Sequence, residues 1–137
     1  MKLRGERAEA EHVVDVQLEE LAGLLRERNA VDARIGRLIN RPMTAGHAGE
    51  WIASRIFDIE LEPSAVAKAI DGRFRNGRLA GRSVNVKWYL KRENLLDMTE
   101  DAALDYYLVL AGPEASSRDD RILRPWRIDA VYLFDAQ

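Results

Sequence analysis

Residues 83–90 alternate between polar and apolar side chains, and this period of two constrains the fold more than any other part of the sequence. On a β-strand, alternate side chains point to opposite faces. The more polar face comprises Ser83, Asn85, Lys87 and Tyr89, and the apolar face comprises Val84, Val86, Trp88 and Leu90. The apolar face is therefore expected to be buried. The other is either a half-exposed surface or the rim of a site.

The first half of the chain instead repeats its apolar residues at helical spacing. This spacing predicts helices over residues 7–28, 31–40, 45–58 and about 63–70. Asn29 can end the first of them, which would make residues 7–40 a helical hairpin or a bent helix. Thr44 is a good N-cap for the third helix. We assign residues 1–42 to an N-terminal helical extension packed on a core of residues 43–137, within a single domain.

The second half of the chain is expected to be mainly strands. Residues 70–75 and 78–90 form a predicted hairpin across Asn76–Gly77, a dipeptide that favours a two-residue type I′ turn. A short helix is expected around residues 95–103. Residues 106–111 are continuously apolar, which is typical of a central strand buried on both faces, and residues 127–134 form the last predicted strand. Helices followed by these strands predict an α/β fold with a mixed sheet.

Composition narrows the classes of function. The net charge is −2 and the chain has no cysteine, which excludes disulfides and thiolate metal sites. No apolar run approaches the roughly 20 residues needed to span a bilayer, and no signal peptide is visible. The sequence therefore predicts a cytoplasmic protein with no membrane partner.

Positive charge is concentrated in one window. No acidic residue lies between Asp71 and Glu93. The basic residues of this window that are candidates for contact with nucleic acid are Arg73, Arg75, Arg78, Arg82, Lys91 and Arg92. Such a strip can bind phosphate in a protein that is otherwise near neutral. It can equally be a solvated edge hairpin, because charged side chains protect sheet edges from aggregation.

Four side chains could together carry metal-dependent chemistry on phosphodiesters. Glu50 and Asp71 are carboxylates, Asn85 offers an amide oxygen, and Lys87 adds positive charge. Oxygen ligands hold Mg²⁺ against a phosphate, and a positioned lysine stabilises the negative charge that develops in the transition state. Each residue also has a simpler explanation: Glu50 as a surface helix residue, Asp71 as a cap or a partner of Arg82, and Lys87 as a solubilising side chain.

In this order the residues resemble the pattern of the PD-(D/E)xK nuclease superfamily. That pattern has a glutamate on a helix, an aspartate at a strand start and an acid-x-lysine on the next strand. The resemblance covers residues 45–135 and implies a restriction-endonuclease-like fold. It implies that Glu50, Asp71 and Asn85 bind Mg²⁺ or Mn²⁺ and that the catalytic residues are Lys87, Glu50 and Asp71. It implies a bacterial-type hydrolase acting on nucleic acid, with DNA favoured over RNA.

The sequence departs from the family pattern at Asn85, which occupies the position of the ligand acid. An amide is a weaker Mg²⁺ ligand than a carboxylate, so a catalytically inactive binding or assembly module is the alternative. Its N-terminal helices would then form a homodimer or partner surface. A small interaction domain with no nucleic-acid role is the third possibility.

The pairing of the hairpin strands provides a geometric condition for the site. A two-residue turn at Asn76–Gly77 would pair Asp71 with Arg82 and place it on the face of Val84. A bulge or a longer turn near Gly81 would bring Asp71 to the face of Asn85 and Lys87. The site hypothesis therefore requires that bulge or longer turn.

Overall fold

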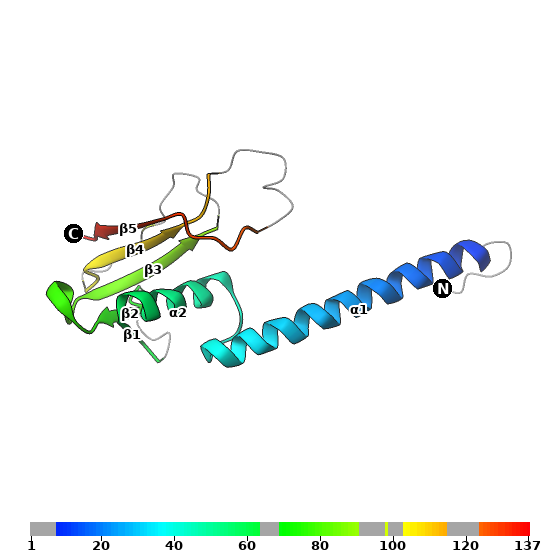
Figure 1. The fold of residues 1–137 in the computed structure, drawn as a ribbon, viewed down its shortest axis with the longest axis horizontal. Helices are drawn as coiled ribbons and strands as arrows, with labels where there is room; N and C mark the ends of the chain where they lie inside the picture. Colours follow the sequence, from blue (N-terminus) through cyan, green and yellow to red (C-terminus); the bar gives the residue numbers. More distant parts are fainter. Residues whose placement is uncertain (1–7, 64–68, 91–97, 99–102, 115–123) are drawn as a thin grey trace. The chain divides into compact units, whose positions relative to one another are not determined.

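The computed structural model describes residues 8–63, 69–90, 98, 103–114 and 124–137. The chain divides into two compact units, Met1–Met43 and Thr44–Gln137. The first contains helix α1 (Ala8–Ile39). The elements of the second are α2 (Ala45–Phe57), β1 (Ile59–Leu61), β2 (Gly72–Phe74), the 3₁₀ turn η1 (Gly77–Leu79), β3 (Ser83–Tyr89), β4 (Tyr106–Ala111) and β5 (Ala130–Asp135) (Figure 1).

Helix α1 is continuous, so the predicted break at Asn29 is wrong. The helix ends where Asn40 adopts a left-handed conformation with a φ of 57°. The backbone N–H of Arg41 then donates to the carbonyl of Gly36 at 3.1 Å, as in a Schellman C-cap. Asparagine costs little within a helix compared with glycine or proline, so Asn29 alone does not stop it.

Helix α2 begins and ends through specific capping contacts. The Thr44 hydroxyl accepts a hydrogen bond from the backbone N–H of His47 at 3.0 Å, which confirms the predicted N-cap. At the other end Asp58 is left-handed and its backbone N–H donates to Ser54. The sequence therefore determines this helix locally at both ends.

Within the described residues, the sheet has five strands in the order β1-β2-β3-β4-β5. Strands β3 and β4 are parallel, and the other three pairs are antiparallel. The α/β class and the mixed sheet are therefore confirmed. Strand β4 has its predicted bounds, whereas β1 was not predicted because three residues carry too little periodicity. Most of the helices predicted at 63–70 and 95–103 lies outside the described residues.

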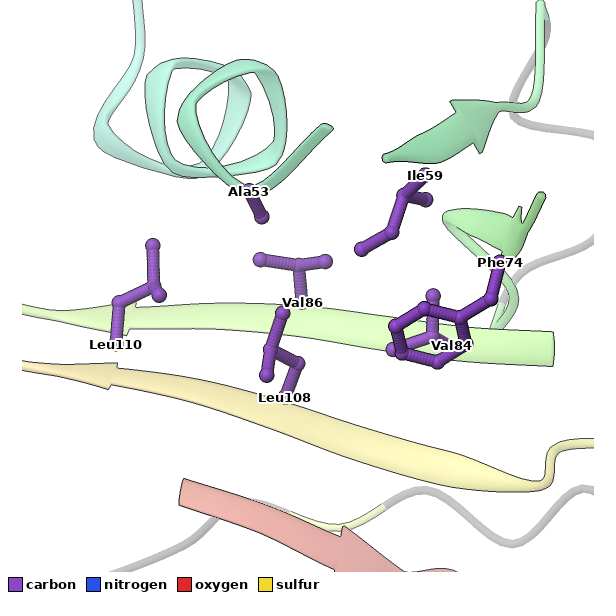
Figure 2. Packing of buried hydrophobic residues seen from close by; sticks show 7 residues of the cluster. All are labelled: Ala53, Ile59, Phe74, Val84, Val86, Leu108 and Leu110. Carbon is purple, nitrogen blue, oxygen red and sulfur yellow. The ribbon is translucent and has the colours of Figure 1, made fainter. Parts of the chain in front are cut away.

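Two buried clusters lie in the second unit. Figure 2 shows the larger cluster, in which Ala53 of α2 faces the side chains of β3 and β4. Its buried members are Ala53, Ile59, Phe74, Val84, Val86, Leu108 and Leu110. The smaller cluster comprises Ala69, Ile70, Leu104 and Tyr107. Helix α2 thus covers the face of β3 that carries Val84 and Val86, and the polar face of β3 points to the other side.

In the part of the chain that the structure describes, no helix combines the length and the apolar character needed to cross a membrane.

Candidate functional site

The connection between β2 and β3 sets the register of the site. Gly72 pairs with Val84 and Arg73 with Ser83. Directly before these pairs, the backbone N–H of Asp71 donates to the carbonyl of Val84, so Asp71 also lies beside Val84 on β3. The expected two-residue type I′ turn is wrong. The chain instead makes the 3₁₀ turn η1, and Gly81, with a φ of 81°, donates from its N–H to the carbonyl of Phe74 at 2.8 Å. The longer turn that the site hypothesis required is therefore present.

Asp71 lies where β2 begins and is fixed to β3 by two hydrogen bonds. Its backbone N–H donates to the carbonyl of Val84 at 2.9 Å. Its carboxylate oxygen Oδ2 accepts from the backbone N–H of Val86 at 2.7 Å. Strand N–H groups point along the sheet towards the neighbouring strand, so the carboxylate lies near the plane of the sheet. From that position it borders both faces.

The side-chain amide of Asn85 has a hydrogen-bond partner at its nitrogen but, among the described residues, not at its oxygen. Its Nδ2 donates to the carbonyl of Ala69 at 2.9 Å. Because a carbonyl can only accept, this bond fixes the amide orientation and leaves Oδ1 as the free acceptor. Oδ1 is buried and has no hydrogen-bond partner within the described structure. A buried acceptor without a donor costs about 1–3 kcal/mol, which a water or a cation would recover.

Lys87 lies two residues further along β3 and shares the face of Asn85. Its side chain is half-buried. The Nζ atom lies 5.9 Å from the ring centroid of Tyr107, a cation–π contact. Tyr107 is 2% exposed and pairs directly with Asn85 across the parallel ladder. The contact with the Tyr107 ring therefore keeps the Lys87 ammonium group on the face of the sheet that carries Asn85.

Glu50 comes from the helix that covers the opposite face. It is only 8% exposed, on the same turn of α2 as Gly49. A Cβ added at Gly49 would lie 2.9 Å from the Cβ of Trp88, so α2 approaches β3 closely there. The structure therefore brings Asp71, Asn85 and Lys87 together on β2 and β3, and holds Glu50 on the α2 side of the sheet.

The predicted basic strip is partly engaged in local contacts. An Nη1 atom of Arg73 donates to the carbonyl of Gly81 at 3.2 Å. Arg75 pairs with Asp58 at 3.4 Å, and Arg82 approaches Asp105 at 3.7 Å. Arg78 is exposed on η1. Lys91 and Arg92 lie outside the described residues. All four described arginines remain exposed, so the hairpin keeps a basic surface, weakened by two carboxylates.

One polar group next to the site was not predicted from the sequence. The Asp105 carboxylate accepts from the backbone N–H and the hydroxyl of Ser83, at 2.9 and 3.1 Å. In return the Ser83 hydroxyl accepts from the backbone N–H of Asp105 at 2.9 Å. These bonds join the starts of the parallel strands β3 and β4. The available signal was an acid directly before the apolar run at 106–111.

The same contacts shift the acidity of this carboxyl. The backbone N–H of Ser83 is the main cause that holds the pKa of Asp105 below its ordinary value of 3.8. Burial acts in the opposite direction, and the Ser83 hydroxyl and the charges of Arg82 and Arg73 lower the pKa further. Each of these lowering contacts favours the ionised form.

The Asp105→Asn variant is expected to lose less stability in acid than the wild type. A lowered folded-state pKa stabilises the fold above the unfolded value of 3.8, and this contribution disappears as the pH falls through the folded-state pKa. Thermal unfolding measured between pH 6 and pH 2.5 checks this. Glu60→Gln, at an exposed position of β1, is the control. Parallel acid profiles for wild type and Asp105→Asn would contradict it.

The site offers oxygen ligands suited to a hard divalent cation, but only a small number of them. Among the described residues, no three His, Cys, Asp or Glu side chains come together to form a metal site. Mg²⁺, however, commonly uses one or two carboxylates and completes its shell with waters and substrate phosphates. Asp71 and the unpartnered Oδ1 of Asn85 match that smaller requirement.

Comparisons with protein-family models and with curated proteins give no match to this sequence.

Proposed function

We propose that this protein is a metal-dependent nuclease with a restriction-endonuclease-like fold, acting on DNA in preference to RNA. The observation that carries the proposal is that Asp71 bonds to β3 on either side of Asn85, through the carbonyl of Val84 and the N–H of Val86, with Lys87 on the same strand. The order of α2, the β1-β2-β3 meander and the parallel strand β4 is consistent with the fold. Asp71 at a strand start and Lys87 on the next strand match the family pattern.

In this proposal each residue has a distinct role. Asp71 and the Asn85 amide oxygen would hold Mg²⁺ or Mn²⁺. Glu50 lies on the α2 side of the sheet and would stand outside this ligand set. The bound ion would polarise a phosphoryl oxygen and lower the pKa of a coordinated water. Lys87 would donate to the phosphoryl oxygens as charge develops on them. Tyr107 restrains the ammonium group for that task.

The arginines of the β2–β3 hairpin would supply the part of the affinity for nucleic acid that does not depend on its base sequence. Arg73 pairs with Ser83 and therefore lies on the face of β3 that also carries Asn85 and Lys87. A phosphate backbone bound along Arg73 and Arg78 would thus pass the proposed site. Binding that relies on such contacts weakens steeply as salt rises, because counterions are released from the nucleic acid.

A catalytically inactive binding or assembly module is the second candidate, and one contact favours it. Oδ2 of Asp71 already accepts a hydrogen bond from the backbone N–H of Val86, so one of the two carboxylate oxygens helps to hold the strands together. Together with the amide at position 85, this leaves a site with little negative charge. In an inactive member the same residues would fix the hairpin, and the arginines would still bind nucleic acid.

Metal titration separates the two candidates. An active protein is expected to bind Mn²⁺ in calorimetry, and Asp71→Ala is expected to lose that binding. Asn85→Asp is expected to tighten it roughly tenfold or more, because a carboxylate replaces an amide as ligand. Glu60→Gln is the matched control, since it removes an exposed carboxylate on β1.

Unchanged Mn²⁺ binding in Asp71→Ala would reject the metal site. Failure of both the wild type and Asn85→Asp to bind Mn²⁺ would also reject it. If the wild type binds no Mn²⁺ and Asn85→Asp acquires binding, the fold holds a metal position that the natural chain does not use, which supports the inactive module. Thermal unfolding of each variant in the absence of metal shows whether the loss of the Val86 contact has disturbed the hairpin.

A further inference from the structure

Helix α1 carries an apolar stripe that no other described element of its own unit covers. The stripe follows alternating steps of three and four residues, the spacing of a coiled-coil seam. We call it the α1 seam, and it comprises Leu21, Leu24, Arg28, Val31, Ile35 and Leu38. Leu21, Leu24, Val31 and Leu38 are each more than half exposed. Among the described residues of Met1–Met43, α1 is the sole element of regular structure.

Such a seam needs a partner, because most helical stability in proteins comes from packing of the apolar face. Large exposed apolar surfaces mark interaction sites. The charges along α1 indicate which partner fits. Between residues 15 and 23 the charged residues of α1 are Asp15, Glu19 and Glu20, and in its C-terminal half they are Arg26, Glu27, Arg28, Asp32, Arg34 and Arg37. One end is therefore acidic and the other mainly basic.

We propose that α1 pairs with α1 of a second copy of this chain in an antiparallel coiled coil. Antiparallel pairing overlaps residues 21–38 of the two helices in opposite directions and brings acidic Glu27 of each copy close to basic Arg34 of the other. In the register that matches the two seams, Leu21 lies opposite Leu38 of the second copy and Leu24 lies opposite Ile35. Arg28 then lies opposite Val31, with its aliphatic stem against the seam and its charge at the edge.

The flanking positions favour this direction over the parallel one. Antiparallel pairing places Glu27 beside Arg34 of the second copy, twice by symmetry. Parallel pairing would instead place Glu27 beside Asp32 and bring the two Arg28 side chains together within the seam. Like charges in such positions are a recognised device against the wrong pairing. The sequence of α1 therefore discriminates between the two orientations.

Charge reversal on the full-length chain tests the proposal. In sedimentation equilibrium we expect a dimer whose dissociation constant rises roughly tenfold in Glu27→Arg and in Arg34→Glu, and returns towards the wild-type value in the double variant. Neither residue has an oppositely charged neighbour three or four positions away in α1. The reversals therefore break no ion pair within the helix. Ala33→Lys, on the face away from the seam, is the control.

Engineered cysteines report the orientation directly, because the chain has no natural cysteine. Antiparallel pairing predicts that a mixture of Leu21→Cys and Leu38→Cys forms a mixed disulfide, whereas Leu21→Cys alone does not crosslink. The two copies of position 21 would then lie about 25 Å apart along the axis, at roughly 1.5 Å per residue. Crosslinking of Leu21→Cys alone, tighter association of Glu27→Arg, or a monomeric wild type would each overturn the proposal.

Discussion

The Lys87→Ala variant is expected to lose at least about 100-fold in the rate of Mg²⁺-dependent cleavage, while its affinity for the same nucleic acid changes by less than about threefold. Removing one preorganised group that stabilises developing charge typically costs 10²–10³ in rate. Lys87 lies on the face of β3 that carries Asn85, beside the ring of Tyr107. The proposed contact of Lys87 with the phosphoryl oxygens strengthens as these oxygens gain negative charge in the transition state. Its removal therefore lowers the cleavage rate and not the affinity for the nucleic acid.

A matched arginine variant separates catalysis from binding. Arg78→Ala removes an exposed charge on η1. It is expected to weaken binding and to reduce the slope of log affinity against log salt by about one. Cleavage is measured on single- and double-stranded substrates with Mg²⁺ or Mn²⁺ at saturating protein, so that binding does not limit the rate. If Lys87→Ala cleaves at the wild-type rate, Lys87 has no catalytic role. If the wild type binds but does not cleave, the inactive module is supported.

The second large effect concerns the core that holds the site. Leu110→Ala is expected to lower the free energy of unfolding of the unit Thr44–Gln137 by about 3 kcal/mol, because a buried leucine loses its transfer energy and leaves a cavity. Leu110 is fully buried on β4, in the cluster that packs α2 against β3 and β4 (Figure 2). Urea unfolding followed by tryptophan fluorescence measures this unit, because Trp51, Trp88 and Trp126 all lie within it.

Leu133→Ala is the matched control for that experiment. Leu133 lies on the neighbouring strand β5 and is 44% exposed, so the same chemical change leaves a smaller cavity. The expected loss is below about 1 kcal/mol. Equal losses for the two variants would mean that the complete burial of Leu110 does not make it more important for stability than the half-exposed Leu133.

Local signals predicted several elements correctly. Thr44 is the N-cap of α2, as predicted. This was predictable because an N-cap is a local contact between a side chain and the backbone three residues later. The apolar run at 106–111 became β4 with the expected bounds, because a strand buried on both faces requires apolar residues at every position. The α/β class followed from the order of these periodicities.

The predictions that failed depended on contacts between distant residues or on weak local preferences. Asn29 lies inside α1, since its small helix penalty is easily overcome in a long helix. Asn76–Gly77 did not form the type I′ turn. The carbonyl of Phe74 bonds instead to Gly81, and Arg75 donates its backbone N–H to Asp58 at 3.0 Å. Arg75 and Asp58 are 17 residues apart and belong to separate segments, so the short turn sequence does not contain this contact.

The sequence by itself determined the residue types of the candidate site and the alternation that puts Asn85 and Lys87 on one face of β3. Alternation along a strand is a property of the extended backbone and needs no neighbour. Only the tertiary structure decided that Asp71 bonds to Val84 and Val86 on either side of Asn85, and that Oδ1 of Asn85 is buried without a donor. Register and burial arise from how the strands pair, and a turn three residues longer than the one the sequence favoured pairs Gly72 with Val84 instead of Gly81.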